Sequence, residues 1–108
     1  MGYTPPNGSE RRYEQVLASL RSRFILGLPQ RQFAIEQAVN KPVRLTELHR
    51  LAGAAGSFGL TDLGTVARSA EAALAADDDA SYQQWWRRAV ALIDATVRSN
   101  NEDDTVRH

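Results

Sequence analysis

The chain has 108 residues, enough for one small domain with a single hydrophobic core. Its 13 basic and 13 acidic residues cancel, which disfavours a general electrostatic attraction to nucleic acids or anionic membranes. The absence of cysteine excludes disulfides, cysteine-ligated zinc and thiol catalysis. No apolar run is long enough to span a bilayer or to form a secretory signal, so we expect a cytoplasmic protein.

The first third of the chain has the periodicity of two helices. Residues 1–8 are predicted to be a flexible leader, and Ser9 to cap a first helix whose apolar side chains recur at helical spacing, namely Tyr13, Val16, Leu17, Leu20 and Phe24. This helix should break near Gly27. Pro29 suits the first turn of a second helix, which should end at residues 40–42 and turn four side chains inward: Phe33, Ile35, Ala38 and Val39.

Two further helices are predicted in the middle of the chain. The third should begin between Val43 and Thr46 and run to about Phe58, where Gly59 can adopt the left-handed conformation that ends a helix. Thr61 is the expected N-cap of a fourth helix, which has a regular apolar stripe: Leu63, Val66, Ala67, Ala70 and Leu74.

The last helix follows a turn of three aspartates at residues 77–79 and should open at Asp79 or Ser81. Its apolar face is wide and contains Tyr82, Trp85, Trp86, Ala89, Leu92, Ile93, Thr96 and Val97. The spacing favours a core position for the first of the two tryptophans and leaves core and surface equally open for the second. We expect the chain to be frayed from Asn100 onward and residues 102–108 to be disordered.

These elements predict an all-α fold, because no segment has the alternation of a strand. Short connections between consecutive helices favour antiparallel neighbours. We therefore expect an antiparallel up-down four-helix bundle with an additional N-terminal helix, spanning residues 9–101.

The third predicted helix carries His49 among residues with very small side chains. At about 100° per residue, His49 lies beside the face that should be buried, which consists of Leu48, Leu51, Ala52, Ala55 and Phe58. Gly53 and Gly56 fall on the same side as His49, although each glycine inside a helix costs about 1 kcal/mol relative to alanine. Two interpretations stay open: close packing against another helix, or clearance for a large partner that approaches His49.

The residues around this histidine follow a known pattern. Residues 49–53, HRLAG, with a further glycine at Gly59, are similar to the pattern histidine, any residue, leucine, lysine, glycine and a second glycine ten residues after the histidine. Leu63 and the pair Ala70-Glu71 stand where the pattern has a leucine and a leucine-glutamate or alanine-glutamate pair. In these residues the chain resembles the histidine-containing phosphotransfer (HPt) domains of bacterial two-component phosphorelays.

The resemblance implies that His49 accepts a phosphoryl group from the aspartyl phosphate of a receiver domain and passes it to the aspartate of another receiver. This role suits an exposed imidazole, which is mostly neutral and therefore nucleophilic near pH 7. Such a protein is a carrier rather than a turnover enzyme. It needs no metal or cofactor of its own, because the partner receiver brings an acidic pocket and magnesium.

The resemblance also implies the partners and the surface they contact. The expected partners are response-regulator receiver domains and a hybrid sensor histidine kinase, with no nucleic acid and no membrane. We expect a monomer, because a carrier must present His49 to successive partners. The residues expected around the phosphoryl group and against the docked partner are Arg50, Ala52, Gly53, Gly56 and Ser57.

The chain departs from the family pattern at Ala52, where many members carry a lysine that helps to hold the phosphoryl group. Losing one exposed charge beside a phosphate costs at most about 1 kcal/mol. Arg50 is a candidate replacement, but it lies about 100° around the helix, so its side chain would have to bend back. Ser57 and Thr46 could donate to a phosphoryl oxygen, although hydroxyls inside helices more often bond to their own backbone.

Two other functions stay open at this point. In a degenerate HPt domain the same surface would dock on a receiver or kinase with the histidine unused, and Ala52 is the feature that favours this. In a hydrolase His49 would act as a base, but no nucleophile and carboxylate stand at a usable spacing in the sequence. His108, the other histidine, lies at the terminus and cannot form a metal site with His49 alone.

Overall fold

The computed structural model describes the backbone of residues 8–107 and the side chains of residues 11–102. This part of the chain contains five helices and no strand. In chain order the helices are α1 (Gly8–Leu26), α2 (Leu28–Glu36), α3 (Lys41–Ser57), α4 (Thr61–Ala75) and α5 (Asp79–Arg107). The predicted leader lies outside the described residues except for Gly8, and the side chains of Ser9 and His108 lie outside them as well.

Helix α3 begins two residues earlier than predicted, because Asn40 is its N-cap. The Asn40 Oδ1 accepts a hydrogen bond from the Val43 N–H at 2.9 Å, and Pro42 occupies the first turn, where its missing N–H costs nothing. Residues 40–42 therefore open α3. The expectation that they end the preceding helix is wrong, since α2 already ends at Glu36.

The starts of α4 and α5 also differ from the prediction. Thr61 is the first residue of α4, and the cap position belongs to Leu60, whose side chain accepts no hydrogen bond. Helix α5 begins at Asp79, as expected, but the residue that caps it is Asp78, whose Oδ1 accepts from the Ser81 N–H at 3.2 Å. The cap of α5 is therefore an aspartate, but it is Asp78, one residue before the predicted Asp79.

The predicted helix ends at Gly27 and Gly59 are confirmed. Gly27 separates α1 from α2, and Gly59 follows α3 with a φ of 77°, the left-handed conformation that glycine adopts without strain. Helix α5 contains neither glycine nor proline. With no residue to end it, α5 continues to Arg107, through most of the segment where a frayed and disordered tail was expected.

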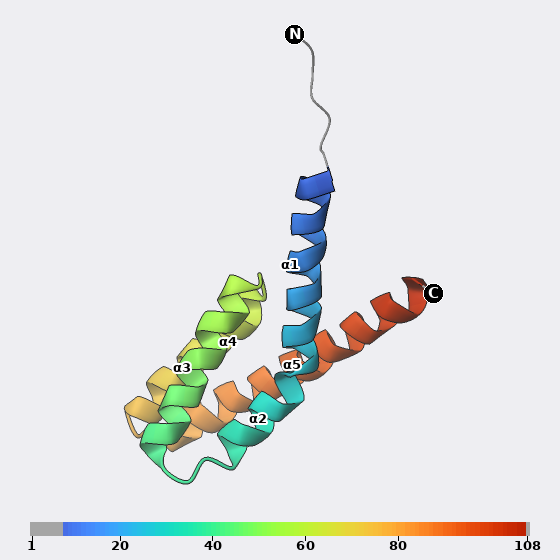
Figure 1. Cartoon of the computed structure of the whole chain (residues 1–108). Coiled ribbons are helices and arrows are strands. Elements are labelled where there is room, and N and C mark those ends of the chain that lie inside the picture. The colour runs from blue at the N-terminus through green and yellow to red at the C-terminus, as the bar shows by residue number, and fades with distance from the viewer. Residues whose placement is uncertain (1–7, 108) are drawn as a thin grey trace.

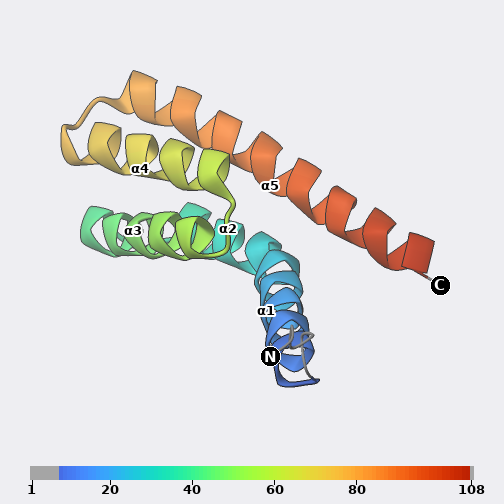
Figure 2. The same cartoon turned by 90° about the horizontal axis from the view of Figure 1, so that it is seen from above.

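Helices α2 to α5 pack as a four-helix bundle, and α1 is an additional N-terminal helix (Figure 1). Helix α4 lies between α3 and α5, and α2 contacts both α3 and α5 and so closes the bundle (Figure 2). The all-α fold class is confirmed. The largest fully buried side chains come from α1, α2, α3 and α5: Ile25, Leu28, Ile35, Leu48, Leu51 and Ile93. No helix among the described residues is both long and apolar enough to cross a membrane.

Two of the four inward positions expected in the second helix are wrong. Phe33 and Val39 are 64% and 87% exposed. Helix α2 spans only nine residues, and of the four predicted positions Ile35 alone is fully buried. Val39 lies beyond the end of the helix, so the periodicity that places it inward does not apply to it.

Of the two tryptophans of α5, the spacing favoured a core position for Trp85 and left Trp86 open, but it is Trp86 that enters the core. Trp86 is 7% exposed and belongs to the core, and its Nε1–H donates to Glu36 Oε2 at 3.0 Å. Trp85 packs half-buried at the edge of the core, and the Arg88 guanidinium carbon lies 5.4 Å from the centroid of its ring, within cation–π range. The buried indole of Trp86 thus has a partner for its N–H, as buried tryptophan generally requires.

Helix α1 carries the predicted apolar stripe, but only its C-terminal end packs on the bundle. Phe24 is buried and stacks on Phe58 with 4.9 Å between ring centroids. The rest of the stripe lies on the part of α1 that projects from the bundle (Figures 1 and 2) and is 42% to 67% exposed: Tyr13, Val16, Leu17 and Leu20.

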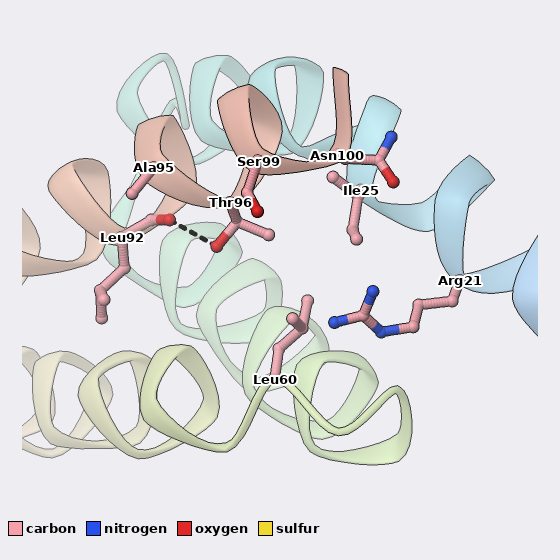
Figure 3. A pocket seen from close by; sticks show the side chains of 8 residues that line it. All are labelled: Arg21, Ile25, Leu60, Leu92, Ala95, Thr96, Ser99 and Asn100. Atoms are coloured by element: carbon pink, nitrogen blue, oxygen red, sulfur yellow. Dashed lines mark hydrogen bonds between the residues drawn. The ribbon is translucent and has the colours of Figure 1, made fainter. Parts of the chain in front are cut away.

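A pocket of about 320 Å³ lies where α1 and α5 diverge (Figure 3). Its lining comes from α1, from α5 and from Leu60 between α3 and α4. At this end of the molecule Arg21 Nε donates to the Phe58 carbonyl oxygen at 3.1 Å, and Ser22 and Asn100 form a side-chain hydrogen bond at 3.3 Å. The contacts between α1 and α5 are therefore partly polar, and none of the pocket residues belongs to the surface around His49.

Candidate functional site

His49 lies in the middle of α3 with its side chain 79% exposed. The leucines before and after it in the buried stripe, Leu48 and Leu51, are completely buried. They fix the rotation of α3 about its axis, so that the next position around the helix must face outward. The imidazole therefore stands at the surface beside the buried face, where the helical wheel predicted it.

A carboxylate lies beside the ring, on the neighbouring helix. Glu71 of α4 places Oε2 at 3.2 Å from His49 Nδ1, and the Glu71 side chain is 26% exposed. A carboxylate can only accept a hydrogen bond, so Nδ1 carries the proton in this pair. In the neutral ring the other nitrogen, Nε2, then has the free lone pair and is available from solvent.

Sequence reasoning assigned no role to Glu71, because 22 residues separate it from His49. The available signal was the Ala70-Glu71 pair, which was used only as part of the family pattern. The expectation that His49 has no carboxylate within reach is therefore wrong, because the packing of α4 on α3 brings Glu71 to it. No nucleophile accompanies this carboxylate: among the described side chains, no hydroxyl is hydrogen-bonded to His49.

The glycines of α3 occupy open positions, whereas the glycine of α4 occupies a crowded one. A Cβ added at Gly53 or at Gly56 would meet no atom within 4 Å. Close packing therefore does not require glycine at either position. Close packing is instead required at Gly64 of α4, where a Cβ would lie 3.2 Å from the Ala52 carbonyl oxygen and 3.4 Å from the Gly56 nitrogen. Gly64 lets the two backbones approach, and Gly53 and Gly56 leave free space beyond His49.

Ala52 lies in this close contact and is only 2% exposed. The expectation that it belongs to the surface around the phosphoryl group is therefore wrong: its methyl group faces α4 and the core, and a docked protein could not touch it. The helical wheel had already placed Ala52 on the buried face, and that placement is the correct one.

The other polar candidates on α3 are exposed but already engaged. Arg50 Nη1 donates to Glu47 Oε1 at 3.3 Å, one turn back along the same helix. The Ser57 hydroxyl donates to the Gly53 carbonyl oxygen and the Thr46 hydroxyl to that of Pro42, each at 3.0 Å. Both hydroxyls thus bond to their own helix backbone, as such residues commonly do.

The described residues contain no group of three or more histidine, cysteine, aspartate or glutamate side chains that could hold a metal ion. The site consists of one exposed imidazole, one carboxylate that orients it and an open strip of helix backbone. This arrangement offers a nucleophile to a large partner and does not enclose a small substrate.

A comparison with protein-family models gives a match to the Hpt domain over residues 19–99, from the second half of α1 to α5. Neither the curated proteins nor the solved structures gave a match. The match covers well over half of the chain and includes both His49 and Glu71. The chain therefore belongs to the Hpt domain family, whose members are phosphocarrier modules of two-component signalling that interact with response-regulator receivers and kinases.

Proposed function

We propose that this protein is a phosphorelay carrier in which His49 accepts a phosphoryl group from the phospho-aspartate of one receiver domain and delivers it to the aspartate of another. The observation that carries the proposal is the contact between Nδ1 of the exposed His49 and the Glu71 carboxylate, which in the neutral ring leaves the lone pair on Nε2. The donor aspartate belongs to a separate domain, so the acceptor must be reachable by a whole protein. An exposed ring beside open helix backbone meets that need.

The chemistry balances without a general base. The Nε2 lone pair attacks phosphorus, and the bond from phosphorus to the aspartate oxygen breaks with its electron pair, which releases a carboxylate. The ring keeps its Nδ1 proton and gains a positive charge. Glu71 stabilises that charge through a charge-assisted hydrogen bond. In the return step a carboxylate oxygen of the second receiver's aspartate attacks phosphorus. The phosphorus–nitrogen bond breaks with its electron pair going to Nε2, and the ring leaves as neutral imidazole.

The receiver supplies most of the remaining requirements. Its acidic pocket and magnesium neutralise the transferred group and align donor and acceptor, which is most of what phosphoryl transfer demands. The carrier then acts without a metal or cofactor of its own. We assign the docking surface to the exposed residues Arg50, Gly53, Gly56 and Ser57. A cytoplasmic monomer would allow successive receivers and a hybrid histidine kinase to reach the same ring.

The test is phosphotransfer from a radiolabelled phospho-receiver to the wild-type protein and to His49→Gln. We expect label on the wild-type protein and none on His49→Gln, because glutamine has no nucleophilic nitrogen at that position. His108→Gln, which removes the only other histidine, is the matched control and should be labelled like the wild type. Label on His49→Gln at the wild-type level would contradict the proposal.

A second pair of variants tests the role of Glu71. Glu71→Gln keeps an oxygen that accepts from Nδ1–H but removes the charge, whereas Glu71→Ala removes both. Hydrogen bonds to charged groups contribute about 1.5–3 kcal/mol when buried and less at an exposed site, so we expect transfer to slow by about fivefold to tenfold in Glu71→Ala. Glu71→Gln should fall between Glu71→Ala and the wild type. Equal rates in all three proteins would remove Glu71 from the mechanism.

The docking module without phosphorylation predicts a different outcome of the same experiment. In that case receivers would bind the wild-type protein, as measured by calorimetry, while no receiver of the source organism would transfer phosphate to His49. The exposed His49 and its pairing with Glu71 favour the carrier, because a docking surface alone needs no oriented nucleophile.

A further inference from the structure

The cation that many family members place three residues after the histidine is absent from α3 in this chain, and Arg50 does not replace it. Position 52 is a buried alanine. Arg50 points to the outer side of α3, where it is bound to Glu47. If a positive charge assists the phosphoryl group on His49, it must come from a different helix.

Helix α4 has one basic residue, Arg68, and its position in the helix pair is fixed by two contacts. At one level Glu71 meets His49, and at the other Gly64 lies against Ala52 and Gly56. Because α3 and α4 run antiparallel, Arg68 lies between these two levels. It is three residues from Glu71, or about 4.5 Å along the helix axis, on the side of the open glycines.

Arg68 also faces the correct side. On α4, Gly64, Arg68 and Glu71 fall within about 60° of one another, since positions three and four apart share a helix face. Gly64 and Glu71 both contact α3, so this is the face that α4 turns toward α3. Arg68 is exposed, which places it at the surface edge of the seam, as His49 is on the other helix.

The side chain of Arg68 is free to bind. The three cationic residues of α3 are all engaged: Lys41 with Asp77, Arg44 with the Ile35 carbonyl oxygen and Arg50 with Glu47. Among the described residues of α3 and α4, Arg68 alone of the lysines and arginines has no hydrogen-bond or ion-pair partner. The neighbouring space is also open, because nothing lies within 4 Å of a Cβ built at Gly53.

We infer that Arg68 binds the phosphoryl group carried by His49, and that α4 thereby supplies the positive charge that α3 lacks at Ala52. This inference rests on the proposed function. The guanidinium suits the role, because its planar set of N–H donors binds two phosphoryl oxygens at once and remains charged at every relevant pH. The phosphoryl group would then lie between an arginine on α4 and the histidine on α3, with Glu71 on the far side of the ring.

The test uses potassium phosphoramidate, a small phosphoryl donor that phosphorylates histidine without a receiver, with the reaction followed by ³¹P NMR. We expect Arg68→Ala to be phosphorylated on His49 about threefold to tenfold more slowly than the wild type, as expected for an exposed charge pair. Arg68→Lys should recover part of the rate. In the phosphorylated proteins, the ³¹P resonance should titrate at a higher pH in Arg68→Ala, because a neighbouring cation favours the doubly charged phosphoryl group.

Arg87→Ala is the matched control. Arg87 is an exposed arginine on α5 that lines a groove against α2, and this variant should behave like the wild type. Equal rates and equal ³¹P titrations in wild type and Arg68→Ala would overturn the inference and leave the proposed function intact. A larger loss in Arg50→Ala than in Arg68→Ala would also overturn it. Failure of the wild-type protein to be labelled on His49 by phosphoramidate or by a phospho-receiver would instead refute the proposed function, and the inference with it.

Discussion

The α3–α4 pair and the end of the molecule where α1 meets α5 are packed in opposite ways. Between α3 and α4 the backbones approach so closely that a Cβ on Gly64 would lie 3.2 Å from the Ala52 oxygen. At the other end α1 and α5 diverge around a pocket of about 320 Å³, and the apolar stripe of α1 is largely exposed (Figures 2 and 3).

The candidate site, the contact between His49 and Glu71, lies on the tightly packed pair α3 and α4. A histidine oriented by a carboxylate on another helix keeps its geometry only if the two helices keep their spacing and register. Small residues at the contact provide that, because rigid backbones meet directly there instead of through mobile side chains. The diverging end has no such requirement, so we expect changes in α1 to leave the site undisturbed.

The largest effect should follow truncation of the core under the site. Leu51→Ala removes a completely buried side chain of α3 and should lower the free energy of unfolding by about 2–5 kcal/mol. Leu17→Ala, the same substitution on the stripe of α1, should cost less than about 1 kcal/mol, because Leu17 is 45% exposed. Urea unfolding followed by the fluorescence of the two tryptophans, Trp85 and Trp86, measures both. Equal losses would show that α1 is as firmly packed as α3.

A smaller loss of stability is expected when the contact between α3 and α4 is forced apart. Gly64→Val inserts a branched side chain against backbone atoms that cannot rotate away, and should destabilise the fold by about 1–3 kcal/mol. It should also weaken the His49–Glu71 contact, which NMR detects as a change in the tautomer populations of the ring. A Gly64→Val protein with unchanged stability and unchanged ring signals would contradict the close approach of the two helices.

A gain in stability, not a loss, is expected from a substitution at Gly53, on the exposed side of the same helix pair. Gly53→Ala adds a Cβ in open space inside a helix and should stabilise the protein by up to about 1 kcal/mol. If the glycine keeps the surface clear for a partner, this more stable variant should accept phosphate more slowly from a phospho-receiver. Its rate with phosphoramidate should stay the same, because that donor is small. Unchanged transfer from the receiver would remove the clearance role.

The smallest effect concerns pH and the cap of α5. Hydrogen bonds from the Ser81 hydroxyl and backbone N–H hold the pKa of Asp78 below its usual range. A depressed pKa in the folded state stabilises the fold above the ordinary aspartate pKa of about 4, and this contribution disappears as pH falls through the folded value. Asp78→Ala should therefore be less stable than the wild type at pH 7, and the difference should shrink in acid.

Asp78→Asn serves as the control for this comparison, because it keeps a capping oxygen that does not titrate. Its stability relative to Asp78→Ala should change little with pH. A wild-type advantage over Asp78→Ala that persists unchanged to pH 2 would mean that the aspartate charge contributes nothing to the cap. Thermal unfolding followed by circular dichroism across the pH range distinguishes these outcomes.

Much of the fold was predictable because its signals are local. The helix type of each segment, the break at Gly27 and the left-handed Gly59 depend on a few neighbouring residues and on backbone sterics. The errors occur where neighbours in space compete with local rules. Trp86 and not Trp85 enters the core because α2 packs there and offers Glu36 to the indole, and nothing in the sequence of α5 reveals that partner.

Local signals along the chain were enough to predict that the protein is helical, that His49 lies beside the buried stripe of its helix, and that the chain resembles one family. These conclusions need only the helical period and a short motif. The contact between α3 and α4 adds that Glu71 orients His49 and that Gly64, rather than Gly53 or Gly56, sets the helix spacing. The physical reason is that these relations join two helices, and the register between helices is fixed by packing across their contact and not by the residues of either one.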